Sequence, residues 1–237
     1  IMATPVTTIK QGDHTTINMA ETRLSREVSS NQSGLHPRLA DIVARHLHNA
    51  FRRPVTEHAR RAYSSVRERL AQAPCPLVLD SFCGTGESSI ALALRHPDHL
   101  VIGVDQSAYR LGKHRPADLP NYLLVRAPAE DLWQLLLADG LSLDHHYLFY
   151  PNPWPKGKHL QRRVHGHAGF AWLLRLGGRI ELRSNWQVYV EEFGTAMHLA
   201  GRRGLVTRVA AEIPVTAFER KYRDSGHNLW CYRSAAP

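Results

Sequence analysis

Short apolar runs alternate with amphipathic segments along most of this chain. The apolar runs predict seven strands, at residues 77–80, 100–104, 122–125, 146–149, 179–182, 205–210 and 228–232. Between them, apolar residues that recur at intervals of three and four predict helices at residues 87–95, 129–137, 169–176 and 186–200. Apolar strands that alternate with helices are typical of a parallel sheet covered on both faces. The pattern therefore predicts an α/β fold with a mainly parallel, seven-stranded sheet.

The N-terminal part of the chain follows a different pattern. Residues 1–34 are rich in Thr, Ser, Asn and Gln without a sustained apolar period, which predicts an irregular arm. Two amphipathic helices are expected next, one from Pro37 and one capped by Thr56. Pro74-Cys75-Pro76 ends this part, so we divide the chain into an N-terminal arm and helical extension, 1–73, and a second domain, 74–237. Three roles are open for the extension: an RNA-binding appendage, a cap over a ligand cleft, or a dimer surface.

The composition narrows the class of partner. With 237 residues, 43% of them hydrophobic, the chain can bury the core of a globular protein. A net charge of +9 and a pI near 9.8 favour nucleic acid or another anionic surface as the partner. No apolar run reaches membrane-spanning length, and the N-terminus has no signal-peptide core. We therefore expect a cytoplasmic protein that does not bind membranes.

Cysteine and histidine usage predicts no metal centre. The three cysteines have no CxxC spacing, which argues against a disulfide framework or a structural zinc site and fits a reducing compartment. His145, His146, His165 and His167 invite a metal interpretation, but predicted strand and helix boundaries separate the two pairs. We expect surface or packing histidines and no metal.

The turn after the first predicted strand has the residues of a cofactor site. It reads Asp80-Ser81-Phe82-Cys83-Gly84-Thr85-Gly86-Glu87 and runs into a helix. The glycines let the backbone approach a ligand closely and present helix N-terminal amides. Asp105, at the end of the second strand, is placed to accept hydrogen bonds from both hydroxyls of a ribose. Asp80 would repel a dinucleotide pyrophosphate but suits the cationic amino-acid part of S-adenosylmethionine, so the turn resembles that of class I methyltransferases.

A second candidate site follows the fourth predicted strand. Residues 150–163 contain three prolines, Trp154 and several cations, and no acidic residue occurs between Asp144 and Glu181. Prolines fix the backbone and remove amide donors, which predicts an ordered loop rather than a helix or strand. A rigid, aromatic and basic loop is suited to holding a flat, anionic partner.

Three motifs resemble those of one known family in order and spacing. Residues 151–163, PNPWPKGKHLQRR, resemble a P-D-P-W-x-K-x-x-H-x-x-R-R signature. Ser184-Asn185-Trp186 with Tyr189 resembles T-D-W…Y, Thr216-Ala217-Phe218-Glu219-Arg220 resembles T-K-F-E-x-R, and Asn228-Leu229-Trp230 matches a terminal strand. These are motifs of the tRNA (guanine-N7)-methyltransferase family, and the resemblance covers about residues 77–232. It implies a Rossmann-like class I methyltransferase fold, S-adenosylmethionine as cofactor, and tRNA or another structured RNA as partner.

The resemblance also implies a role for each matching position. The cofactor-binding positions would be Asp80, Gly84, Gly86, Asp105, Ala127 and Asn152. Of these, Asp80 would contact the amino-acid end of S-adenosylmethionine and Asp105 its ribose. Asn152 lies where the family's loop aspartate meets both cofactor and guanine, which makes it the candidate catalytic residue.

The substrate-binding positions implied by the resemblance are Trp154, Lys156, Arg162, Arg163, Asn185, Thr216 and Glu219. Thr216 and Glu219 would close the pocket over the guanine. Arg162 and Arg163 would meet RNA phosphates, and Lys156 and Asn185 would contact substrate. Trp154 would stack on a base or pin the loop to the sheet edge.

Four positions depart from the family pattern. Asn152 and Asn185 stand where aspartates are expected, Phe82 replaces a glycine, and Ala127 replaces the acid expected beside the adenine, with Glu130 and Asp131 only nearby. Guanine N7 carries a lone pair, so its methylation needs alignment and desolvation rather than a general base. An asparagine accepts a hydrogen bond but stabilises a cationic purine less than a carboxylate does. The two asparagines therefore predict weaker catalysis or a different target base.

Two alternatives start from the same loop. Asn-Pro-Trp-Pro resembles a permuted form of the N-P-P-aromatic motif of exocyclic-amino methyltransferases, in which the asparagine binds the target amino group. The other alternative is a non-catalytic RNA-binding protein that keeps the methyltransferase fold. Binding of S-adenosylmethionine would argue against the non-catalytic alternative.

Overall fold

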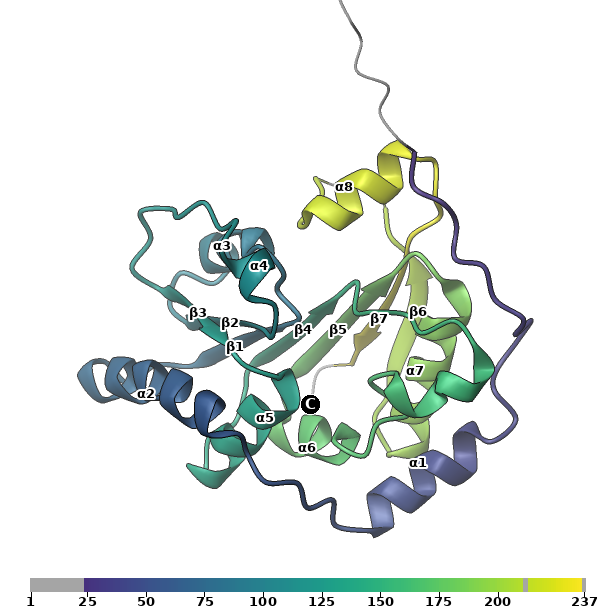
Figure 1. Ribbon diagram of the computed structural model, residues 1–237, viewed down its shortest axis with the longest axis horizontal. Helices are drawn as coiled ribbons and strands as arrows, with labels where there is room; N and C mark the ends of the chain where they lie inside the picture. The colour runs from purple at the N-terminus through teal and green to yellow at the C-terminus, as the bar shows by residue number, and fades with distance from the viewer. Residues whose placement is uncertain (1–23, 211–212, 236–237) are drawn as a thin grey trace, which may run out of the picture.

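The computed structural model describes residues 24–210 and 213–235, and Figure 1 shows their arrangement. Of the irregular arm predicted for residues 1–34, residues 1–23 lie outside the described part. Residues 24–34 contain neither helix nor strand. Within the described ranges, no helix is both long and apolar enough to cross a membrane.

All seven predicted strands are present and form one sheet in the order β3-β2-β1-β4-β5-β7-β6. The strands are β1 (Leu77–Ser81), β2 (Leu100–Asp105), β3 (Tyr122–Arg126), β4 (His145–Phe149), β5 (Arg179–Ser184), β6 (Gly204–Arg208) and β7 (Trp230–Ser234). Neighbours among β1 to β5 pair in parallel, and β7 runs antiparallel to both β5 and β6. The predicted α/β fold with a mainly parallel sheet is confirmed.

Every predicted helix is also found, with ends that differ by a few residues. These helices are α1 (Leu39–His48), α2 (Glu57–Gln72), α3 (Glu87–Arg95), α5 (Ala129–Ala138), α6 (Phe170–Leu176) and α7 (Gln187–Leu199). The sequence pattern missed α4 (Ala108–Leu111), the 3₁₀ helix η1 (Gly157–Arg162) and α8 (Ala217–Asp224). Helix η1 corrects the prediction that 150–163 is loop throughout. These elements are short, and α8 carries too few apolar residues to show a buried stripe.

The sheet separates two hydrophobic clusters. Leu77 and Leu79 of β1 pack into the larger cluster with α1, α2, α5, α6 and α7, whereas Val78 packs with Leu92 of α3 on the opposite face. The alternation follows from the period of two along a strand. Figure 1 shows the five helices on one side of the sheet and α3 with α4 on the other.

The two N-terminal helices share the main core. Helix α1 packs against α6 and α7, and α2 packs against α5 and β3. Ile42 and Val43 of α1 and Val66 of α2 are at most 4% exposed, within the same cluster as the strands. Each such side chain contributes roughly 1.5–3 kcal/mol on burial. The helical extension therefore supports the sheet, while the domain boundary at residue 73 stays a prediction.

Residues 24–36 run as an extended arm from α8 to α7, seen along the right of Figure 1. The Ser25 amide donates to Ser225 Oγ at 2.8 Å, beyond the end of α8. Further along, Ser30 Oγ donates to the Pro155 carbonyl at 2.6 Å, and the His36 amide donates to Glu192 Oε1 of α7 at 2.9 Å. The arm thus ties α8, the loop after β4 and α7 together.

Candidate active site

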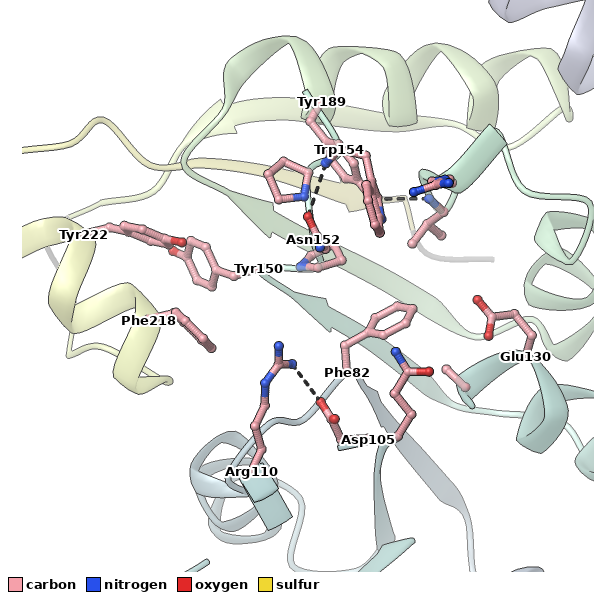
Figure 2. Close-up of a pocket in the computed structure, with 16 residues that line it drawn as sticks. Phe82, Asp105, Arg110, Glu130, Tyr150, Asn152, Trp154, Tyr189, Phe218 and Tyr222 are labelled. Carbon is pink, nitrogen blue, oxygen red and sulfur yellow. Dashed lines mark hydrogen bonds and ion pairs between the residues drawn. The ribbon is translucent and has the colours of Figure 1, made fainter. Parts of the chain in front are cut away.

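A cavity of about 400 Å³ opens at the carboxyl ends of the parallel strands. The loops after β1, β2 and β4 meet there because parallel strands end at the same edge of a sheet. Figure 2 shows Asp105 and Asn152 on opposite sides of this cavity, with Phe82 between them. The lining residues are Phe82, Asp105, Gln106, Arg110, Ala129, Glu130, Tyr150, Pro151, Asn152, Pro153, Trp154, Arg162, Val164, Tyr189, Phe218 and Tyr222.

Asp80 lies fully buried beneath the turn that follows β1. Its Oδ2 atom accepts hydrogen bonds from Ser88 Oγ at 2.6 Å and Ser89 Oγ at 2.7 Å. Its Oδ1 atom is buried and has no hydrogen-bond partner among the described residues. Burial raises the pKa of Asp80 to about 6, although the two serine hydroxyls act in the opposite direction. An unpaired, buried carboxylate oxygen is suited to a cationic ligand group.

The glycines of this turn have conformations that other residues rarely adopt. Gly84 and Gly86 have φ values of +60° and +78°. A Cβ atom on Gly86 would lie 2.6 Å from Leu124 and 2.8 Å from His114, so the backbone there has no room for a side chain. Phe82 also has a positive φ, 67°, at the position where the family has a glycine.

Asp105 reaches the cavity with its carboxylate already partly occupied. The Gly84 amide donates to Oδ2 at 3.0 Å and the Ser107 amide donates to Oδ1 at 2.8 Å. Arg110 Nη1 donates to Oδ2 at 3.3 Å from the exposed side. The two backbone amides therefore fix the orientation of the carboxylate. A ribose could replace the exposed Arg110 side chain as its third partner.

At the position where an acid was expected beside the adenine, Ala127 does not line the cavity, whereas the nearby Glu130 of α5 does. Ala127 is 1% exposed. Figure 2 shows Glu130 at the end of the cavity away from Phe218. Asp131 is buried and binds Arg53 Nη2 at 2.9 Å, which removes it from the site. Glu130 is thus the carboxylate available on this side.

The loop after β4 has a strained backbone. Tyr150 and Trp154 have φ values of 53° and 45° and, with Phe82, are the described non-glycine residues with positive φ. All three line the cavity. Asn152 lies between Tyr150 and Trp154 in the chain and is exposed. Its Oδ1 atom accepts a hydrogen bond from the Trp154 amide at 3.4 Å. Such conformations are costly and concentrate at functional sites, where the surrounding structure holds them.

The half-buried Trp154 and the exposed Arg162 form a pair at the mouth of the cavity. The Arg162 guanidinium lies 4.7 Å from the centre of the Trp154 ring, and His159 contacts the same ring edge-on at 5.6 Å. Lys156 is also exposed but does not line the cavity; it borders a shallow depression with Ser29, Ser30, Asn31 and Lys158. These cations face outward without a carboxylate partner in the described ion pairs.

The structure corrects the expectation that Arg163 meets RNA phosphates. Its side chain is completely buried and forms an ion pair with Glu192 of α7, which is equally buried. Glu192 also accepts a hydrogen bond from His165 Nε2 at 2.9 Å. Burial alone would raise the pKa of Glu192, but His165 and Arg163 outweigh it and lower the pKa to about 2. Arg163 therefore anchors the loop to α7 from beneath.

Three further predicted substrate positions lie outside the cavity wall. Asn185 Nδ2 pairs with His227 Nδ1 at 3.3 Å. Thr216 Oγ1 accepts from the Glu219 amide at 2.9 Å and so caps α8. Glu219 is 2% exposed; its Oε1 binds Arg183 Nη1 at 2.8 Å, and its buried Oε2 has no hydrogen-bond partner among the described residues, so its contact with a guanine stays a prediction. Thr216 borders a second hollow that also contains Phe82 and Gly84.

Helix α8 instead presents two aromatic residues that were not predicted as site residues. Phe218 and Tyr222 line the cavity, and Figure 2 shows them entering it from α8. Their separation of four residues puts both on one helical face, and this spacing was the available signal. The other lining residues that were not predicted as site residues are Phe82, Gln106, Arg110, Ala129, Glu130, Tyr150, Pro151, Pro153, Val164 and Tyr189.

The residues present fit S-adenosylmethionine. Asp105 and Glu130 offer carboxylates in the cavity wall, and Asp80, which is buried beneath the turn and does not line the cavity, offers an unpaired oxygen. Gly84 has a positive φ, donates its amide to Asp105 and lines the adjacent hollow. A cationic amino group, a ribose and an adenine can be matched to Asp80, Asp105 and Glu130 in that order.

Comparison with known proteins agrees with this arrangement. Residues 74–232, more than half of the chain, match the family model described as "Putative methyltransferase". The chain is 30% identical to the tRNA (guanine-N(7)-)-methyltransferase of Saccharophagus degradans over 65% of this chain and 73% of that protein. It is 33% identical to the protein of the same name from Pseudomonas fluorescens strain SBW25, over 65% and 69% of the two chains.

Solved structures share the fold at lower sequence identity. The 16S rRNA methyltransferase KamB aligns with a TM-score of 0.53 at 18% identity, covering 78% of this chain and 96% of that one. The structure of an antibiotic-related methyltransferase gives a TM-score of 0.54 at 14% identity, covering 73% and 94%. The class I methyltransferase fold and the cofactor predicted from the sequence are confirmed, and the chain belongs to the tRNA (guanine-N(7)-)-methyltransferase family of S-adenosylmethionine-dependent enzymes.

Proposed function

We propose that this protein transfers the methyl group of S-adenosylmethionine to N7 of a guanine in tRNA. The observation that supports the proposal is that one cavity is lined both by Asp105, the last residue of β2, and by Asn152, in the loop after β4. Asp105 belongs to the part of the site expected to bind the cofactor. Asn152 belongs to the Pro-Asn-Pro-Trp motif, which resembles the family signature. A base bound against the loop after β4 would therefore face the cofactor end directly.

In this proposal the chain's acids hold the cofactor. Asp80 Oδ1 accepts from the ammonium of the amino-acid part, and Asp105 accepts from the ribose hydroxyls in place of Arg110. Glu130 takes the position near the adenine that Ala127 cannot fill. Gly84 leaves the backbone without a side chain beside the ligand, while Gly86 lets the turn pack closely on Leu124 and His114. S-adenosylmethionine supplies an electrophilic methyl group bound to a sulfonium.

Aromatic residues and Asn152 would position the guanine. Tyr150, Trp154, Phe218 and Tyr222 offer faces and edges on which a planar base can stack. Asn152 uses one lone pair of its carbonyl oxygen for the Trp154 amide, which leaves a second for the N–H edge of the guanine. Because N7 is already nucleophilic, these residues act by alignment and by excluding water.

Exposed cations beside the cavity would hold the RNA backbone. Arg162 lies over Trp154 at the cavity mouth, and Lys156 and Lys158 lie further along the same segment. Arg163 has no part in this contact because it is buried. Phosphate contacts of this kind bind without reading sequence, so they support RNA binding in general and leave base choice to the cavity.

The relatives described above carry the guanine-N7 name, which does not favour an exocyclic-amino target or a non-catalytic binding protein. Asn185 pairs with His227 and does not line the cavity, so we propose no direct contact between Asn185 and the guanine. A cytoplasmic location stays a prediction.

Mass spectrometry of nucleosides tests the proposal. tRNA lacking 7-methylguanosine is incubated with the protein and S-adenosylmethionine and then digested to nucleosides. The expected result is 7-methylguanosine, absent with Asp105→Ala, whose folding is checked by circular dichroism. A methyladenosine or methylcytidine product would instead support the exocyclic-amino alternative. No methylated product, together with no calorimetric binding of S-adenosylmethionine, would support the non-catalytic binding protein.

A further inference from the structure

Three histidines gather at the edge of the sheet opposite to the candidate active site. His96 and His99 lie in the connection between α3 and β2, and His145 is the first residue of β4. One ring nitrogen of each histidine lies within 4.8 Å of the others. The starts of parallel strands lie at the edge away from their carboxyl ends, where the cavity is. The cluster is therefore separate from the site described above.

One ring nitrogen of His96 and one of His99 have partners that set the ring orientation. His96 Nε2 lies 2.9 Å from the Tyr147 hydroxyl, and His99 Nε2 lies 3.2 Å from Asp144 Oδ2. His99 Nδ1, by contrast, is buried and has no hydrogen-bond partner in the described part of the chain. A carboxylate or hydroxyl on the second nitrogen is the usual support of a metal-binding histidine. A buried nitrogen without a partner is rare and calls for a ligand.

The backbone around the cluster is held in place. The side-chain amide of Asn121 donates to the carbonyl oxygens of His96 and His99, at 3.1 and 3.2 Å. The Asp144 amide donates to the Leu77 carbonyl at 2.9 Å, which fixes the residue before β4 against β1. The three imidazoles thus project from a fixed frame, as a preformed binding site requires.

We propose that His96, His99 and His145 bind one divalent transition-metal ion, with zinc as the metal best suited to them. Three imidazoles plus a water complete the four-coordinate geometry that zinc prefers. Zn–N bonds of about 2.1 Å place tetrahedral ligands about 3.4 Å apart, so the ring nitrogens close by at most about 1.4 Å on binding. Small side-chain rotations supply that movement.

The ion would link two segments far apart in the sequence. It joins the connection after α3 to the start of β4, on either side of β1 in the strand order. The unfolded chain does not bring these histidines together, so binding favours the folded state. The ion would therefore stabilise the folded chain at an edge of the sheet away from the active-site cavity.

Calorimetric titration of the untagged protein with zinc chloride tests the proposal. The expected result is one ion per chain, with a melting temperature raised by roughly 5–10 °C at a hundredfold excess over Kd. Cobalt(II) in place of zinc is expected to give the visible absorption of a tetrahedral site. Wild-type protein that binds neither metal would overturn the proposal.

Variants assign the ligands. His99→Gln and His145→Gln are expected to abolish binding, and Asp144→Asn is expected to weaken it 10- to 100-fold because only the ring support is lost. His198→Gln, at an exposed histidine of α7, is the matched control and should bind like the wild type. Circular dichroism in the absence of metal checks folding. Unchanged stoichiometry and affinity in folded His145→Gln, or equal loss in His198→Gln, would show that the cluster is not the site.

Discussion

Arg163 and Glu192 form an ion pair in which both side chains are completely buried. Arg163 ends the basic segment after β4, and Glu192 lies in the middle of α7. Gln32 of the N-terminal arm donates to the same carboxylate at 2.5 Å, and so does the His36 amide at 2.9 Å. The pair therefore joins the loop after β4, α7 and the arm at one buried point, which rigidifies the wall of the cavity.

Removing the charge of Glu192 should destabilise the protein strongly. Glu192→Gln leaves the Arg163 guanidinium buried without its counter-ion, and the expected loss is about 3–5 kcal/mol in the free energy of unfolding. Urea denaturation measures it. Glu191→Gln is the control, because Glu191 lies beside it on α7 and its carboxylate only accepts from Gln187, at 2.7 Å. A loss from Glu192→Gln no larger than that from Glu191→Gln would contradict the prediction.

The neighbouring arginines should respond differently to substitution. Arg162→Ala is expected to change the unfolding free energy by no more than about 0.5 kcal/mol, because its side chain is exposed. It should weaken tRNA binding. It should also reduce the slope of log K against log salt concentration by about one, which corresponds to the loss of one phosphate contact. Filter binding at several salt concentrations measures both effects. Arg163→Ala should instead lose stability, as Glu192→Gln does, and equal stability of the two arginine variants would refute the distinction.

Binding of S-adenosylmethionine should depend on pH through Asp80. The pKa of Asp80 is raised to about 6 by burial, so its carboxylate is charged above that pH and neutral below it. Affinity is therefore expected to be full at pH 7–8 and to fall as the pH drops through about 6, because the cofactor's ammonium loses its anionic partner. Calorimetry across this range measures the effect.

The variant Asp80→Asn tests whether the pH dependence of cofactor binding comes from Asp80 rather than from another titrating group. The variant should bind S-adenosylmethionine at least about tenfold more weakly at pH 8, since it lacks a charge-assisted hydrogen bond. Its affinity should also vary little between pH 5 and 8. A pH profile in the variant that still follows that of the wild type would assign the titration to another group.

The two asparagines that replace expected aspartates should not be equivalent. Asn152 lines the cavity, whereas Asn185 pairs with His227 outside it. Asn152→Asp is expected to raise the rate of guanine methylation by about tenfold, roughly 1.4 kcal/mol, because a carboxylate stabilises the cationic purine. Asn185→Asp should change the rate less than twofold. Single-turnover methyl transfer to tRNA measures both rates, and a larger effect at Asn185 than at Asn152 would reverse the assignment.

Much of the fold follows from local patterns. The apolar runs of the strands and the periodic apolar residues of the longer helices are properties of neighbouring residues, so they can be read along the chain. The glycine turn, Asp105 and the Asn-Pro-Trp loop are local in the same sense. The cavity confirms that these segments lie together, since Asp105 and Asn152 both line it. Short elements such as α8 escaped prediction because few apolar residues mark them.

Pairing between distant residues was decided by the tertiary structure alone. Arg162 and Arg163 are alike in sequence, and no acid near them suggests that one is buried; the partner of Arg163 comes from α7, 29 residues later. His145 has His146 beside it in sequence, but the strand turns His146 to the opposite face, where it bonds Ser81 Oγ at 2.8 Å. The companions of His145 are His96 and His99, because the strand order places the starts of β2 and β4 on either side of β1. Burial and the order of strands, which no local pattern contains, fix these partners.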